Sequence, residues 1–159
     1  MKTTQNPIFF VLMLMLLGLT TTTFTSCAVE GCTDPNSDNY DAEATKDDGS
    51  CIPSRDKFIA TYQVNESCPS GNITFQITVT ASASAENAVI INNLGDFGQS
   101  VTGTVNGNSI SIPNQNISSG GFALSVNGSG SINGDLLIIN YTYNFSGGGE
   151  SCTMNCTKL

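Results

Sequence analysis

The sequence contains no histidine and no tryptophan, and only 11% of its 159 residues are charged. Without histidine, the chain has no histidine-based catalytic triad and no imidazole ligand for zinc. Five Lys and Arg residues stand against 13 Asp and Glu residues, which gives a formal net charge of -8. Because nucleic-acid affinity depends on basic residues that neutralise phosphates, this composition argues against a nucleic-acid partner. It also argues against docking on anionic lipid through a basic patch.

The chain also lacks an apolar run long enough to cross a bilayer: its longest such run extends only from Ile8 to Leu19. That length matches the hydrophobic region of a signal peptide. Residues 24–27 read Phe-Thr-Ser-Cys, and this box resembles that of bacterial lipoprotein precursors, in particular those of Bacteroidetes. The resemblance implies that Cys27 is the first mature residue and carries the lipid, as in an outer-membrane lipoprotein of the bacterial cell envelope. A soluble secreted protein, cut by ordinary signal peptidase, is the alternative.

Residues 31–51 read GCTDPNSDNYDAEATKDDGSC and place six carboxylates between two cysteines. The stretch resembles the GCTDP…DDGSC segments of exported Bacteroidetes proteins and, more distantly, the calcium loops of thrombospondin type 3 repeats. The candidate calcium ligands are Asp34, Asn36, Asp38, Asp41, Asp47 and Asp48. Calcium takes six to eight oxygen ligands, and a cation would relieve the repulsion among these side chains. A solvated acidic spacer, closed by a Cys32–Cys51 disulfide, explains the composition equally well.

Apolar and polar residues alternate along the remainder of the chain. The segments Ile73 to Ala81 and Leu137 to Phe145 show the period of two that is typical of a strand with one buried face. Shorter runs, separated by turns rich in Gly, Asn and Ser, bring the expected number of strands to eight: 58–64, 73–81, 88–94, 101–105, 109–112, 122–126, 137–145 and 152–156. We therefore divide the chain into a signal peptide (1–26), an acidic Cys-bounded stalk (27–56) and an antiparallel β-domain (57–159).

Eight short strands joined by tight turns predict an all-β fold, either a small closed meander barrel or a sandwich. The β-domain is similar in layout to the lipocalin-like domains of Bacteroidetes lipoproteins. In a closed meander, the end of the first strand lies beside the start of the last. This register predicts a Cys68–Cys152 disulfide and leaves Cys156 as a buried thiol without an assigned role.

Aromatic side chains of the β-domain fall mostly on the inward parity, where they either fill the core or line a ligand pocket. The candidates for a pocket are Tyr62, Phe75, Tyr141, Tyr143 and Phe145. An eight-stranded barrel is just wide enough to be filled by side chains or to hold one small ligand. The sequence thus predicts a monomeric, non-catalytic lipoprotein with a binding or envelope-structural role. Its expected partners are the membrane, through the Cys27 lipid, and a small apolar ligand or an envelope protein.

A secreted hydrolase that uses paired carboxylates is the alternative from a different functional class. The acids of the β-domain stand near the expected turns: Glu66, Glu86, Asp96, Asp135 and Glu150. Solvation at turns is their ordinary role, and no spacing singles out a pair. The sequence also leaves open whether the protein faces the periplasm or the outside.

Overall fold

The computed structural model describes residues 28–159, so the predicted signal peptide and Cys27 lie outside the described residues. Most of the described chain forms eight strands: β3 (Ala60–Cys68), β4 (Gly71–Ala81), β5 (Ala88–Asn92), β6 (Ser100–Asn106), β7 (Ser109–Ser119), β8 (Phe122–Asn133), β9 (Leu136–Phe145) and β10 (Gly148–Lys158). They pair in sequence order, and β10 pairs with β3 to close a barrel. The predicted closed antiparallel meander is therefore confirmed, and the sandwich alternative is wrong.

Several strand boundaries differ from those predicted. Phe58 belongs to a 3-10 turn, η1 (Ser54–Phe58), and the first barrel strand begins two residues later. The run predicted over 88–94 ends at Asn92 and is followed by a second short turn, η2 (Leu94–Asp96). The strands β7 and β8 extend well beyond the predicted 109–112 and 122–126. In β7, a register shift between Ile112 and Gln115 interrupts the alternation, which is why the sequence pattern ends early there.

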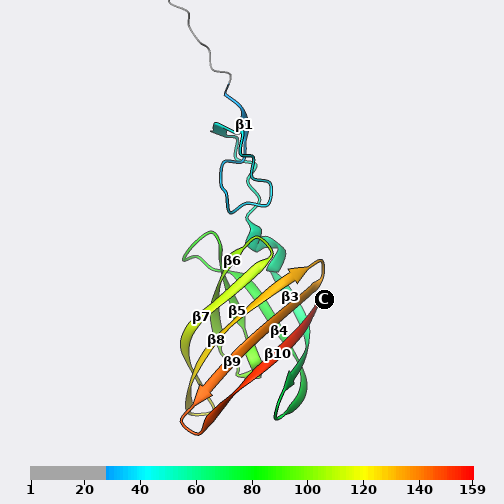
Figure 1. Cartoon of the computed structure of the whole chain (residues 1–159), viewed down its shortest axis with the longest axis vertical. Helices are drawn as coiled ribbons and strands as arrows, with labels where there is room; N and C mark the ends of the chain where they lie inside the picture. Colours follow the sequence, from blue (N-terminus) through cyan, green and yellow to red (C-terminus); the bar gives the residue numbers. More distant parts are fainter. Residues whose placement is uncertain (1–27) are drawn as a thin grey trace, which may run out of the picture.

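The barrel has two different ends (Figure 1). At the stalk end, β3 begins, β10 finishes, and the turns after β4, β6 and β8 return the chain. At the distal end lie the turns after β3, β7 and β9, together with η2, which follows the short strand β5. The acidic segment stands on the stalk end, so the distal end points away from it.

The barrel interior is packed with apolar side chains from all eight strands. Tyr62 is fully buried, and its hydroxyl donates a 2.9 Å hydrogen bond to the carbonyl of Phe58. Gly128 in β8 faces Tyr141 in β9, and a Cβ at this glycine would lie 2.6 Å from the carbonyl oxygen of Asn140. The glycine therefore allows a close approach of the two strands that any other residue would prevent. This packing makes the core a filled interior over most of its length.

The seam between β10 and β3 carries the predicted disulfide. Cys68 and Cys152 are bonded, with Cα atoms 4.4 Å apart, so the register deduced for a closed meander is confirmed. Cys156 lies opposite Val64 as a free, buried thiol. Burial, together with the nearby charge of Glu66, raises the pKa of this thiol to about 12, so it packs as a neutral side chain.

Two basic side chains at the junction fix the stalk to the barrel. Arg55 in η1 donates from Nη1 to three carbonyl oxygens in and around the β4–β5 loop, at 2.7 to 3.2 Å. Lys57 donates to Asp38 of the stalk and to Asn108 of the β6–β7 turn, each at 2.7 Å. Within residues 28–159, no helix is long and apolar enough to span a membrane.

Candidate functional site: a recess at the distal end

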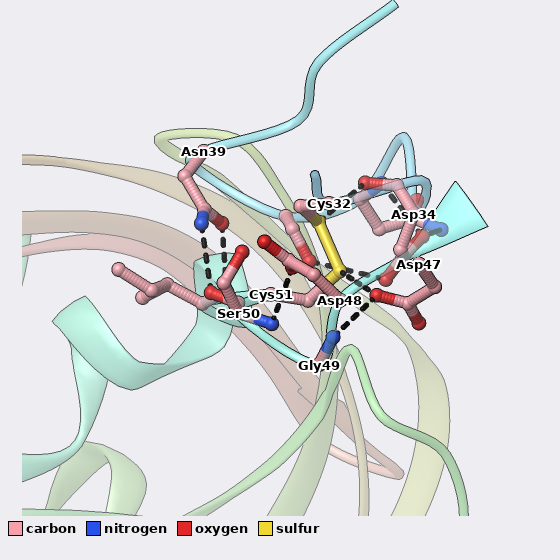
Figure 2. Close-up of a disulfide and its surroundings, with 11 residues drawn as sticks. Cys32, Asp34, Asn39, Asp47, Asp48, Gly49, Ser50 and Cys51 are labelled. Atoms are coloured by element: carbon pink, nitrogen blue, oxygen red, sulfur yellow. Dashed lines mark hydrogen bonds between the residues drawn. A yellow bond between two sulfur atoms is a disulfide. The ribbon is translucent and has the colours of Figure 1, made fainter. Parts of the chain in front are cut away.

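The acidic stalk is organised by its own side chains (Figure 2). A parallel pair of short strands, β1 (Glu30–Gly31) and β2 (Lys46–Asp47), and the predicted Cys32–Cys51 disulfide hold its ends. Asn39 binds the backbone on the other side of the loop, donating to the carbonyl of Ser50 and accepting from the amide of Ile52. The predicted disulfide is therefore confirmed, and it closes a segment held by side chain to backbone hydrogen bonds.

The aspartates of the stalk accept hydrogen bonds from nearby backbone amides. Oδ1 atoms of Asp34, Asp41, Asp47 and Asp48 each accept one at 2.9 Å from the residue two positions later. Hydrogen bonds from Asn36 lower the pKa of Asp34, and those from Ser50 lower the pKa of Asp48. Such turns lessen the repulsion expected among these carboxylates without a metal ion.

The six predicted calcium ligands are distributed along the stalk loop. Asp38 leans toward the barrel, where burial raises its pKa, but hydrogen bonds from Lys57 and Ser54 and the Lys57 charge outweigh this effect and lower it. Among the residues that the structure describes, one group brings three acidic or cysteine ligand atoms within 4.8 Å of one another: Glu66, Cys68 and Cys152. It includes no stalk residue. Its two sulfurs are bonded to each other and offer no thiolate to a metal.

The distal end of the barrel contains a recess of about 190 Å³. Its lining comes from β3, the β3–β4 turn, β4, η2 and its flank, and β9: Glu66, Cys68, Ser70, Gly71, Ile73, Gly95, Phe97, Tyr141 and Tyr143. These residues are distant in sequence and are brought together because the strands of a closed meander all turn at the same two ends. The recess is therefore a product of barrel closure.

Glu66 is the most unusual residue of this lining. It is only 5% exposed, and its Oε2 atom has no hydrogen-bond partner. Its Oε1 atom lies 3.0 Å from Cys68 Sγ, but a disulfide sulfur carries no proton and cannot donate one. A buried carboxyl group without a donor is costly, so this residue marks the recess as a candidate binding site.

Tyr141 approaches the carboxyl of Glu66 from β9. The two groups are close enough to influence each other's protonation, yet neither Glu66 Oε2 nor the buried Tyr141 hydroxyl has a hydrogen-bond partner. Burial raises the pKa of Glu66; the Tyr141 hydroxyl opposes this rise, and the charge of Asp96 adds to it. Burial and the Glu66 charge likewise raise the pKa of Tyr141. Two buried polar atoms therefore remain available to a ligand.

The short turn η2 packs directly against the Tyr141 hydroxyl in the wall of the recess. Gly95 has φ +60°, and a Cβ on it would overlap the Tyr141 hydroxyl and lie 2.7 Å from Phe97 Cε2. Its neighbours Asn93 and Asp96 also have positive φ values, of 67° and 56°. The glycine is thus needed both for the left-handed backbone and for the close approach of η2 to Tyr141 and Phe97.

Of the five aromatic residues predicted to line a pocket, Tyr141 and Tyr143 do so here. Phe145 stacks on Tyr143 with ring centroids 6.3 Å apart, at the outer edge. Tyr62 and Phe75 do not line this recess: Tyr62 is in the core, and Phe75 packs against it.

The sequence suggested that the acids of the β-domain lie at solvated turns, but not all of them do. Glu66, which is buried within β3, contradicts that expectation. Its inward position follows from its parity, which it shares with Tyr62, Val64 and Cys68. Asp96 and Glu150 are also at the distal end, whereas Glu86 and Asp135 are exposed at the stalk end. The hydrolase alternative stays a prediction.

Comparisons with known proteins give little beyond this geometry. No protein-family model matches the chain, and no curated protein matches it significantly. A search of solved structures returns the ileal bile acid-binding protein of zebrafish, in a crystal structure with cholic acid, at 11% identity and a TM-score of 0.33. The similarity covers 65% of this chain and 99% of the zebrafish protein. At so low a TM-score, the functional interpretation depends on the residues of the recess itself.

Proposed function

We propose that this protein is an exported, lipid-anchored, non-catalytic binding protein of the bacterial cell envelope, whose distal recess takes up a small, partly apolar ligand. Glu66 is the observation that carries the proposal: a 5% exposed carboxyl with an unpartnered oxygen in the wall of a recess. An unsatisfied buried polar group costs about 1 to 3 kcal/mol. A ligand that satisfies this group recovers that free energy on binding.

The position of the recess and its rim supports this function. The stalk occupies the opposite end of the barrel (Figure 1), so an anchor at Cys27, directly before the described residues, leaves the distal end facing away from the membrane. Ile73, Phe122 and Phe145 are exposed large apolar side chains at the distal ends of β4, β8 and β9, and Ile73 lines the recess. An apolar rim around a polar, buried group is typical of small-molecule sites.

Binding in the recess is tested by titrating the purified protein with small molecules and following backbone amide resonances. A ligand of the recess is expected to shift the resonances of Gly95, Phe97, Tyr141 and Tyr143 and to leave those of the stalk unchanged. Gly95→Ala serves as the altered variant, because its methyl group would collide with Tyr141 and Phe97 and displace these two lining side chains. Shifts that persist unchanged in this variant would place the ligand elsewhere and contradict the proposal.

The lipid anchor predicts a change in partitioning. Cys27→Ser should move the protein from the detergent-rich phase to the aqueous phase of a detergent phase separation, because the acyl chains provide its membrane affinity. Cys156→Ala, which removes a buried thiol of the core, is the matched control and should stay in the detergent phase. If the wild-type protein itself enters the aqueous phase, the lipoprotein assignment is wrong.

Calcium binding to the stalk predicts a separate effect. In each of the four aspartate turns described above, the Oδ1 atom accepts the amide hydrogen bond. We expect calcium to bind the remaining carboxylate oxygens weakly, with a dissociation constant in the millimolar range of extracellular modules. Titration should shift the amide resonances of residues 32–51, and Asp47→Asn with Asp48→Asn should abolish the shifts. A stalk whose resonances do not respond to calcium, with a melting temperature indifferent to chelator, would leave the spacer interpretation alone.

A further inference from the structure

The charges of the distal end are all of one sign. Every basic residue in the part of the chain that the structure describes lies on the stalk or at the stalk end: Lys46, Arg55, Lys57 and Lys158. The distal end carries Glu66, Asp96 and Glu150. The Glu66 carboxyl therefore has no cationic partner within the described structure, although it lies in the recess wall. An ionised carboxylate in this position requires a positive charge from outside the chain.

The unpartnered atoms of the recess indicate that its ligand carries hydrogen-bond donors. Glu66 Oε2 and Tyr141 Oη are both buried and both able to accept a hydrogen bond. A hard metal ion does not suit this pair, because calcium and magnesium need about six oxygen ligands and the adjacent sulfurs form a disulfide. An ammonium group carries three N–H donors and one positive charge, which matches both requirements.

The remaining lining suits the organic part of such a ligand. Phe97, Tyr141 and Tyr143 form one cluster. The centroid of the Phe97 ring lies 6.3 Å from that of Tyr141 and 5.3 Å from that of Tyr143. Aromatic rings attract cations and pack against short alkyl groups. The volume of about 190 Å³ is below the range of about 300 to 1,000 Å³ that is typical of ligand pockets, so the ligand has few heavy atoms.

We propose that the distal recess binds a small primary ammonium ion, whose N–H groups donate to Glu66 Oε2 and Tyr141 Oη and whose short alkyl group packs against Phe97 and Tyr143. This inference rests on the proposed binding function of the same recess and names its ligand class. Glu66 is the specificity-determining residue, because it supplies the negative charge. A neutral ligand of the same shape leaves that charge uncompensated.

Binding of this ligand is coupled to one proton. Glu66 faces Tyr141 and Tyr143 from β9, Asp96 from η2 and Cys156 from β10, while Glu150 acts on the two tyrosines; none of these groups is a cation. Burial raises the pKa of Glu66 in the empty recess, so at pH values below this raised pKa the carboxyl loses its proton when the ammonium ion binds. The affinity should rise with pH, by up to about tenfold per pH unit, until the raised pKa of Glu66 is passed.

The test is a calorimetric and NMR titration of the full chain, in a non-ionic detergent and an amine-free buffer, with three probes of similar size. Isobutylammonium carries the charge and the donors, isobutanol is its neutral counterpart, and tetramethylammonium has the charge without donors. Isobutylammonium should bind about 10- to 100-fold more tightly than either of the others, as expected for a charge-assisted hydrogen bond. Glu66→Gln should remove this preference, whereas Glu86→Gln, the same change at an exposed acid of the stalk end, should not.

Each outcome separates this inference from the proposed binding function. If isobutanol binds the recess as tightly as isobutylammonium, the recess is a binding site but the ammonium assignment is wrong. If tetramethylammonium binds most tightly, the assigned hydrogen bonds are wrong. Preference for isobutylammonium that survives in a folded Glu66→Gln variant also overturns the assignment. If none of the probes shifts a recess resonance and no other small molecule does so, both the ligand class and the proposed function fail.

Discussion

Replacing both Cys68 and Cys152 with alanine is expected to lower the free energy of unfolding by about 4.5 kcal/mol. The two cysteines are 84 residues apart in sequence and join the first strand of the barrel to the last. In the loop-entropy description, a bond that closes so long a segment removes much of the conformational freedom of the unfolded chain. The β10–β3 pairing then depends on backbone hydrogen bonds and on buried residues such as Met154 and Val64.

Urea unfolding followed by circular dichroism measures this loss, because the strands report on the barrel as a whole. The matched control is Cys32→Ala with Cys51→Ala, which removes the other disulfide, where the sequence separation is 19. That change should loosen the stalk and leave the barrel midpoint nearly unchanged, since the bond lies outside the barrel. A Cys68/Cys152 variant that unfolds at the wild-type midpoint would show that the closing seam is held without the disulfide.

This disulfide is also the clearest case of long-range information in the sequence. Once the strands were taken to form a closed antiparallel meander, the position of Cys68 after the first strand and of Cys152 in the last fixed their pairing. The strands themselves were visible because alternating residues pointed to opposite faces, as in β4 and β9. Topology therefore followed from local periodicity and from the number of strands.

The recess was harder to predict, because it combines residues from separate turns. The parity of β3 did place Glu66 on the same face as Tyr62 and Val64, so its burial was a signal that the turn-based interpretation missed. The entry of η2 between the distal strands had no such signal. Its course depends on three positive φ values and on tertiary contacts with Tyr141, neither of which leaves a periodic pattern.

The junction between stalk and barrel illustrates a second limit. The sequence shows Lys57 and Arg55 only as two of its few positive charges, yet in the structure they bind Asp38, Asn108 and the carbonyls around the β4–β5 loop. The sequence offers many possible partners for a charged side chain near a domain boundary. Only the folded geometry selects among them, and here the selected contacts fix the acidic segment to the barrel.

Glu66→Gln is expected to stabilise the protein at neutral pH, although it removes a native side chain, because glutamine avoids the cost of ionising a buried carboxyl group. The folded protein raises the pKa of Glu66 above its ordinary value of 4.5, chiefly through burial. Between that ordinary value and the raised pKa, the folded state therefore holds a proton that the unfolded state has lost. The contribution of Glu66 to the stability of the wild-type protein therefore falls as the pH rises through this window and is constant above it.

Glutamine is not ionised at any pH in this range, so the variant lacks this contribution to the pH dependence. The difference in unfolding free energy between variant and wild type should be small at about pH 4, grow as the pH rises, and level off above the raised pKa. Urea unfolding in amine-free buffers measures it, because an amine that occupied the recess would stabilise the ionised wild-type protein. Glu86→Gln removes an exposed carboxyl and should follow the wild-type curve. Parallel curves for Glu66→Gln and the wild type would mean that Glu66 ionises without cost in the folded protein. The main argument for a cationic ligand in the recess would then be lost.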